Sequence, residues 1–168
     1  MSLQLSHARL SQLSWKDIHD LYKLRVDVFV HEQQCPYQEI DDIDPLTDTL
    51  HIIGRDDRGM IMGCARLFPD TREHFVQKCL GDVVLDDASD LVQIGRLVTA
   101  TSARGQGEGR RLLEYACALA DAEYPGVLQV ITAQVPLEQY YESFGFVRCG
   151  DVFDWDGMDH LPMMRRGR

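Results

Sequence analysis

The sequence has no apolar run that approaches the roughly 18 residues needed by a membrane-spanning helix. Its opening stretch, MSLQLSHARL, also lacks the continuous apolar core of a signal peptide. These two absences argue against a membrane protein and against secretion. We therefore expect a cytoplasmic protein with no membrane partner.

Cysteine is present, but never in the pairs that build a scaffold. The cysteines are odd in number and no two form a Cys-x-x-Cys pair; they are Cys35, Cys64, Cys79, Cys117 and Cys149. This spacing argues against a disulfide framework or a zinc ribbon and favours reduced thiols. The histidines likewise show no ligand spacing such as His-Glu-x-x-His, so we expect no metal.

Positive charge is scarce. The chain has 17 lysines and arginines against 27 aspartates and glutamates, which gives a formal net charge of -10. Because nucleic-acid binding needs a basic footprint, this balance argues against a nucleic-acid partner. A cationic partner suits such a surface better, although acidic surfaces also serve solubility alone.

Hydrophobic periodicity changes several times along the chain, which indicates mixed helices and strands. No repeat or linker interrupts the sequence, so we expect one domain over residues 1–168. Strands are predicted at 4–10, 49–56, 60–68, 91–100, 127–133 and on both sides of Asp156-Gly157. The turns at Asp57-Arg58-Gly59 and Asp156-Gly157 predict hairpins. Helices are predicted after Ser14, near 72–79, at 108–123 and at 136–144. This order predicts an α/β (α+β) fold with a mixed sheet.

Residues 103–114, ARGQGEGRRLLE, contain features that disfavour a helix start. Glycine is poor in helices, and a cation is badly placed at a helix N-terminus. A bound anion would resolve the conflict, because unpaired N–H groups point outward there and glycines allow close approach. We therefore interpret the stretch as a phosphate site. The alternative is an ordinary glycine-rich turn before a helix.

The spacing of this loop selects among phosphate-binding patterns. It lacks the Gly-Lys-Ser/Thr ending of a P-loop and the G-x-G-x-x-G order of a dinucleotide fingerprint. Arg104-x-x-Gly107-x-Gly109 instead matches the R/Q-x-x-G-x-G/A signature of the GNAT acetyltransferases. The chain resembles that family here. In the family this loop holds the pyrophosphate of acetyl-coenzyme A (acetyl-CoA).

Other segments extend the resemblance. YESFGF (141–146) is similar to the Y-E-x-x-G-F segment of the family, which follows the next strand. LRVDVFVHEQQCPYQEID (24–41), IGRLVT (94–99) and DGMDHLPM (156–163) look like the ElaA-like branch. The resemblance implies a GNAT fold, with a mixed, mostly antiparallel central sheet flanked by helices on both faces.

The resemblance also implies an activity. An acetyl group would pass from acetyl-CoA to a primary amine by direct transfer in a ternary complex. Residues 31–48 are interpreted as an acid-rich loop. This acid-rich loop favours a cationic acceptor, either a small molecule or a peptide amine, and the family makes a homodimer plausible. The alternative is a non-catalytic module that senses acetyl-CoA or another ligand. It is favoured by Gln93 and Gln129, where some relatives carry glutamate.

The resemblance carries binding roles to specific positions. Strand residues would pair with the pantetheine arm, and an N–H near Val98 would polarise the thioester carbonyl. Gln134 stands where many relatives carry asparagine. The expected cofactor-binding residues are Leu97, Val98, Thr99, Arg104, Gly105, Gln106, Gly107, Glu108, Gly109, Arg110 and Gln134.

Catalytic roles follow in the same way. Tyr141 would protonate the leaving thiolate, since a tyrosine stays protonated at neutral pH; the alternative is a packed aromatic residue. Glu32 is our candidate base, with Asp41, Asp42, His51 or a water chain as alternatives. A solvated acidic surface would explain any one of these acids. We expect Arg25 and Arg96 to pair with such acids, and one of the two to be structural. The expected acceptor-binding residues are Arg25, Glu32, Asp41, His51 and His160.

Overall fold

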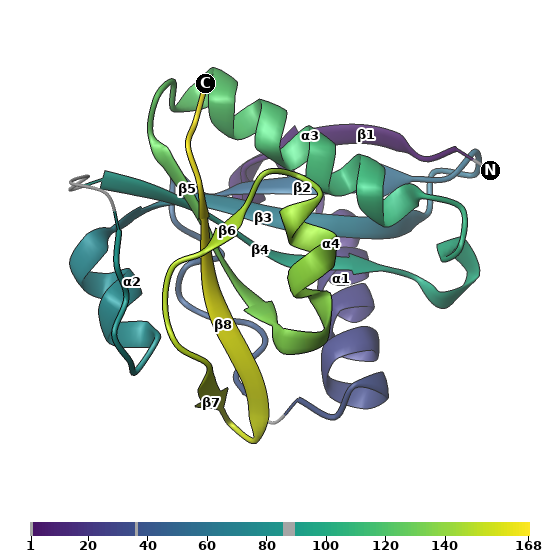
Figure 1. Ribbon diagram of the computed structural model, residues 1–168. Helices are drawn as coiled ribbons and strands as arrows, with labels where there is room; N and C mark the ends of the chain where they lie inside the picture. The colour runs from purple at the N-terminus through teal and green to yellow at the C-terminus, as the bar shows by residue number, and fades with distance from the viewer. Residues whose placement is uncertain (1, 36, 86–89) are drawn as a thin grey trace. The chain divides into compact units, whose positions relative to one another are not determined.

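The computed structural model describes residues 2–35, 37–85 and 90–168 (Figure 1). Their contacts group into two compact units. Unit 1 comprises residues 1–68 and 95–116, and unit 2 comprises 69–94 and 117–168. A single domain therefore stays a prediction. Pro36 of the quoted early pattern lies outside the described residues. Within the described ranges, no helix is long and apolar enough to cross a membrane.

Unit 1 is built on strands that pair in chain order. These are β1 (Gln4–Ala8), β2 (Leu50–Arg55), β3 (Ile61–Thr71) and the second half of β4 (Asp90–Thr99). β1 with β2, and β2 with β3, are antiparallel. The turn before β3 closes where Gly59 N–H donates to Asp56 O at 3.0 Å. Gly59 has φ +78°, a conformation that favours glycine, so the predicted hairpin is confirmed.

The first helix changes geometry along its length. α1 (Trp15–Arg25) begins after Ser14, whose side chain accepts from Asp17 N–H, which confirms the predicted cap. The chain continues as a π-helix, η2 (Val26–Glu32). A π-helix bonds i to i+5 and holds about one more residue per turn than an α-helix. The amphipathic pattern alone did not predict this widening.

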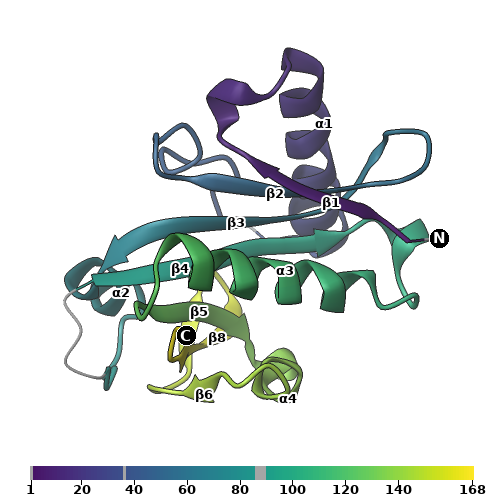
Figure 2. The same cartoon turned by 90° about the horizontal axis from the view of Figure 1, so that it is seen from above.

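Helices cover both faces of the sheet in unit 1. Leu21, Leu24 and Phe29 pack in one core with Cys64 of β3. Gly63, the neighbouring residue, faces Leu112 of α3 (Glu108–Glu123), because successive strand residues point to opposite faces. Figure 2 shows α1 and α3 on opposite sides of β2 and β3.

Unit 2 contains the parallel part of the sheet. The first half of β4 pairs in parallel with β5 (Leu128–Gln134), and β5 pairs antiparallel with β8 (Met158–Arg165). β6 (Val147–Arg148) and β7 (Phe153–Trp155) also pair with β8. The helical elements wholly in this unit are α2 (Arg72–Lys78), η4 (Val135–Leu137) and α4 (Glu138–Glu142). A mixed, mostly antiparallel sheet with flanking helices confirms the predicted fold class.

Three details of unit 2 bear on the predictions. The expected hairpin at Asp156-Gly157 is present, with φ +53° and +87°, as a tight two-residue turn requires. The predicted helix at 136–144 is shorter, because η4 precedes α4. The two-residue strand β6 was missed, since so short an element carries no readable periodicity.

Candidate active site

The glycine loop joins β4 to α3 within unit 1. η3 (Thr101–Ala103) follows β4, and the chain then turns through Gly105 at φ +74° and Gly107 at φ +80°. A Cβ at either glycine would meet no atom within 4 Å. The need for glycine is therefore conformational, and the loop surface is open to a ligand.

The loop delivers the chain to a helix N-terminus. Arg111 N–H donates to Gly107 O at 3.1 Å, so the helical ladder begins at that carbonyl. The first N–H groups of an α-helix have no acceptor within the helix, and those of α3 lie at the end that meets the glycine loop. Sixteen residues of helix reinforce their positive potential. This arrangement suits the pyrophosphate of a coenzyme A thioester.

Each arginine around the loop has a carboxylate partner. The pairs are Arg104 with Glu32, Arg110 with Glu114, and Arg111 with Glu108. Their charges cancel in pairs, so the main-chain N–H groups supply the uncompensated positive potential. The three arginine side chains therefore give the loop no local excess of positive charge.

Glu108 serves the fold through its side chain. Its carboxylate is buried, accepts from Leu3 N–H at 3.2 Å and pairs with Arg111 at 2.7 Å. Arg111 also donates to Leu3 O at 3.0 Å. The two side chains thereby fasten the N-terminal strand to α3. Only the main chain of Glu108 is left to contact a phosphate.

Arg96 lies in the middle of β4 in a left-handed conformation, at φ +51°. This is strained for a residue other than glycine. Its guanidinium forms ion pairs of 3.1 Å with Glu39 and Asp41, and it stacks on the ring of Tyr37 at 5.4 Å. Pairing of Arg96 with one of the candidate acids Glu32, Asp41 and Asp42 was predicted, without an assignment to Asp41. These contacts hold the strained residue directly before Leu97, the first strand residue predicted to meet the cofactor.

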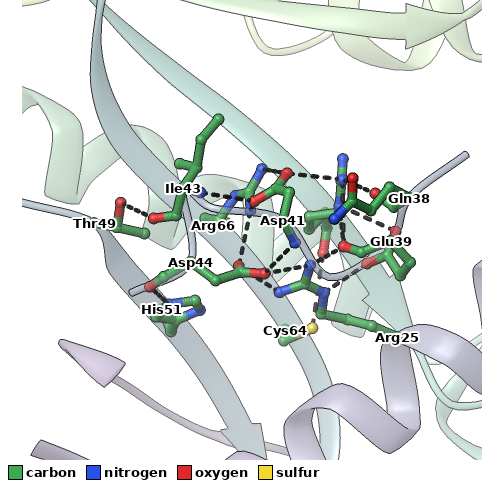
Figure 3. Close-up of polar contacts among 11 residues, drawn as sticks. Arg25, Gln38, Glu39, Asp41, Ile43, Asp44, Thr49, His51, Cys64 and Arg66 are labelled. Atoms are coloured by element: carbon green, nitrogen blue, oxygen red, sulfur yellow. Dashed lines mark hydrogen bonds and ion pairs between the residues drawn. The ribbon is translucent and has the colours of Figure 1, made fainter. Parts of the chain in front are cut away.

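A buried ion network ties the acid-rich loop to the sheet of unit 1 (Figure 3). Its members are Arg25, Arg66, Arg96, Glu39, Asp41 and Asp44. Arg25 and Arg66 both bind Asp44, at 2.7 and 2.8 Å. Three cations and three carboxylates balance, which is the condition for burying charge. We call this set the buried ion network.

Titration in the buried ion network follows from burial and pairing. Burial alone would raise the pKa of Asp44, but the hydrogen bonds and charges of Arg25 and Arg66 lower it. At Glu39 burial prevails over the arginines, and the pKa is raised. Burial lowers the pKa of His51, whose ring meets Asp44 O at 3.0 Å. His51 is therefore neutral near pH 7 and acts as a support for the loop.

These contacts bear on the predicted acceptor residues. Arg25 and His51 are each only 1 % exposed, and Asp41 is clamped by Arg66 and Arg96. A direct contact between Arg25 or His51 and an acceptor would require the loop to move. The acceptor-binding role of Arg25 and His51 stays a prediction. One of Arg25 and Arg96 was expected to be structural, and the buried position of Arg25 fits that role.

Glu32 occupies a different environment. It ends the π-helix η2, is exposed, and receives two hydrogen bonds from Arg104, one of them 2.9 Å. Hydrogen bonds from Arg104 lower the pKa of this carboxyl. The side chain lines a pocket of about 450 Å³ with Leu24, Val28 and Thr101. A carboxylate in that position can receive an ammonium group, although its pairing makes it a weak base.

Unit 2 contains the other predicted site residues. Gln134 on β5 lies directly opposite His160 on β8. His160 is buried against Trp155, and burial lowers its pKa. Tyr141 on α4 packs edge-on against Tyr140 and is half-buried. Burial raises the pKa of Tyr141, so its hydroxyl holds its proton at neutral pH.

Comparison with known proteins decides the family. Residues 19–166 match the model of the acetyltransferase (GNAT) domain. The chain belongs to the GNAT acetyltransferase family. A UPF0039 protein of Mycobacterium tuberculosis is 38% identical, over 99% of this chain and 96% of the relative. Protein ElaA of Escherichia coli is 32% identical, over 92% and 91%.

Solved GNAT structures agree in fold. An acyl-CoA N-acyltransferase from Pseudomonas aeruginosa has a TM-score of 0.81 and 34% identity, covering 98% of this chain and 99% of its own. The crystal structure of Escherichia coli ElaA has a TM-score of 0.80 and 29% identity, covering 97% and 99%. The predicted membership in the family and its ElaA-like branch is thus confirmed.

The two glutamines that raised the sensor alternative have structural partners in this GNAT chain. Gln129 is buried and donates to Asp121 at 2.7 Å, while it accepts from Arg165 at 2.8 Å. Gln93 is also buried; with its amide nitrogen toward Asp70, the distance is 3.1 Å. Both amides satisfy buried polar networks of unit 2. A missing glutamate at these positions is therefore weak evidence against catalysis.

Sequence reasoning missed three members of the buried ion network: Arg66, Glu39 and Asp44. One signal was available, because Arg66 interrupts an apolar strand, GCARLF, and a charge at such a position needs a partner. Nothing in the sequence identified which acids would meet it. No set of three or more metal-ligating side chains gathers among the described residues.

Proposed function

We propose that this GNAT acyltransferase moves an acetyl group from acetyl-CoA to a primary amine of a cationic acceptor. The observation that carries the proposal is the glycine loop, which turns at Gly105 and Gly107 into the N-terminus of α3. A helix N-terminus with an open approach fits a pyrophosphate. Acetyl-CoA supplies an activated thioester; the acceptor would be a small molecule or a peptide amine.

In this proposal the chain first holds and polarises the thioester. The loop from Arg104 to Arg110 binds the pyrophosphate, Gln134 binds the cofactor arm, and the main chain of Leu97 to Thr99 pairs with it. The N–H of Val98 donates to the thioester carbonyl oxygen and stabilises the charge that develops there. The strain held at Arg96 supports this by fixing the direction of the following main chain.

Proton transfers complete the reaction. The acceptor nitrogen forms its bond to the acetyl carbon, and the carbon–sulfur bond breaks. Tyr141 gives its hydroxyl proton to the departing sulfur, and Glu32 or a water molecule takes the proton lost by nitrogen. Burial raises the pKa of Tyr141, so the hydroxyl carries its proton at neutral pH, as this step requires, although the same shift makes it a weaker proton donor.

A binding-only module remains the second candidate, because Glu32 is held by Arg104 and its lowered pKa disfavours base catalysis. A panel of amines with thiol release as the readout separates the two. Turnover on any primary amine supports the enzyme. Tight CoA binding with no turnover across polyamines, amino sugars and peptide amines supports the sensor.

Gly107→Glu tests whether the glycine loop binds the pyrophosphate. A glutamate there is strained at positive φ and repels phosphate, so CoA affinity should fall by at least about 100-fold in calorimetry. Gly59→Glu is the matched control, since Gly59 has nearly the same φ and equally open surroundings. Equal CoA affinity of the two variants would rule out the glycine loop as the pyrophosphate-binding site.

Tyr141→Phe tests the acid. Turnover with an accepted amine should fall by about 100-fold, while CoA affinity changes little. Tyr140→Phe removes the same hydroxyl from the neighbouring position on α4 and should retain activity. If both variants turn over like the wild type, the acid lies elsewhere.

A further inference from the structure

Arg104 and Glu32 form a fork between the glycine loop and the end of η2. Both guanidinium NH₂ groups donate to the carboxylate, one at 2.9 Å, and Thr101 Oγ1 reaches the same carboxylate at 3.5 Å. The side chains are 38% and 42% exposed. The residue predicted to bind phosphate and the residue predicted to bind the acceptor thus hold each other.

The π-helix explains how Glu32 reaches this position. Arg25 and Glu32 are seven residues apart, a spacing that places both on one face of an α-helix. Arg25 is buried in the ion network, whereas Glu32 is exposed at the loop. The wider turns of η2 rotate Glu32 away from the face of Arg25. The widened helix therefore directs this carboxylate at Arg104.

The fork can change partners. A guanidinium presents the same pair of N–H groups to a carboxylate and to a phosphate. An exposed ion pair contributes little to stability, so a ligand with stronger charge can displace one member. Glu108 offers a contrast, because its carboxylate is buried and also bound to Leu3.

We propose that Glu32 and the phosphate groups of the cofactor compete for Arg104, which couples cofactor binding to the acceptor pocket. The inference rests on the proposed function. When phosphate takes Arg104, the carboxylate of Glu32 is released into the pocket formed with Leu24, Val28 and Thr101. It then receives the ammonium group of the acceptor. The cofactor consequently binds before the acceptor.

Calorimetric titration with CoA tests the competition without needing the acceptor. Glu32→Gln frees Arg104 and should tighten CoA binding by about three- to fivefold, the range that an exposed pair allows. Asp27→Asn is the matched control. Asp27 is also an exposed acid on η2, but it pairs with Lys23, so its change should stay below about twofold.

A double-mutant cycle isolates the contact. Arg104→Ala should weaken CoA binding, and adding Glu32→Gln in that background should change nothing further. Equal gains from Glu32→Gln with and without Arg104 would overturn the competition, as would weaker binding by Glu32→Gln alone. If no protein in the set binds CoA, the proposed function falls together with the inference. If the wild type binds CoA and Glu32→Gln does not bind it more tightly, the inference is refuted and the proposed function is not.

Discussion

Two arginine–carboxylate clusters in unit 1 use the same chemistry in opposite surroundings. The buried ion network fixes the acid-rich loop to α1, β3 and β4, with Arg25 and Asp44 almost completely shielded from water. The loop pairs, Arg104–Glu32 and Arg110–Glu114, are between 38% and 53% exposed. Buried pairs cannot exchange partners cheaply, whereas exposed pairs can. The first cluster therefore holds the fold, and the second is available to a ligand.

The largest expected effect comes from a substitution in the buried ion network. Arg25→Met removes one cation from the buried ion network, so that Glu39 keeps only Arg96 and Asp44 keeps only Arg66 as ion-pair partners. It should reduce the free energy of unfolding by about 3–5 kcal/mol in urea titrations. Arg110→Met is the control from the loop pairs and should cost less than about 0.5 kcal/mol. Similar losses in the free energy of unfolding of the two variants would contradict the distinction between the buried ion network and the exposed loop pairs.

A second experiment separates the strain at Arg96 from its ion pairs. Glycine accepts φ +51° freely and alanine does not, so Arg96→Gly should be about 1 kcal/mol more stable than Arg96→Ala. At Met62 on β3 the order should reverse, because glycine weakens an ordinary strand position. Thermal and urea unfolding of the four variants measure both differences. Arg96→Ala being the more stable of its pair would contradict a strained backbone.

The smallest expected effect is the change with pH and salt in the stability that Glu32 contributes. Its folded pKa is lowered, so the stability it adds is present above the unfolded pKa, about 4.3, and is lost as pH falls through the folded value. Glu32→Gln should therefore melt slightly below the wild type at pH 7 in low salt. The melting difference should shrink as the pH falls below about 4.3, and it should vanish in about 0.5 M salt.

Persistence of that melting difference in high salt would show that Glu32 belongs with the buried groups. Asp44 should behave differently, since its lowered pKa is set inside the protein and salt cannot screen it. Acid unfolding of the wild type should thus retain its pH dependence in both salt concentrations.

Local patterns predicted most of the elements. The cap at Ser14, the turn at Asp156-Gly157 and the start of α3 at Glu108 are all present, because each depends on a few neighbouring residues. The glycine loop was readable for the same reason. The π-helix and β6 were missed, because neither has a local pattern that distinguishes it from an ordinary helix or loop.

The sequence by itself determined the family, the fold class and the position of the glycine loop, since glycine spacing and hydrophobic periodicity depend on residues close together in the chain. Only the tertiary structure decided which charges meet. Arg66 lies 25 residues from Asp41, and Arg104 lies 72 residues from Glu32. No periodicity relates positions so far apart. Folding brings them together, and burial then decides which pairs are fixed and which can be exchanged for a ligand.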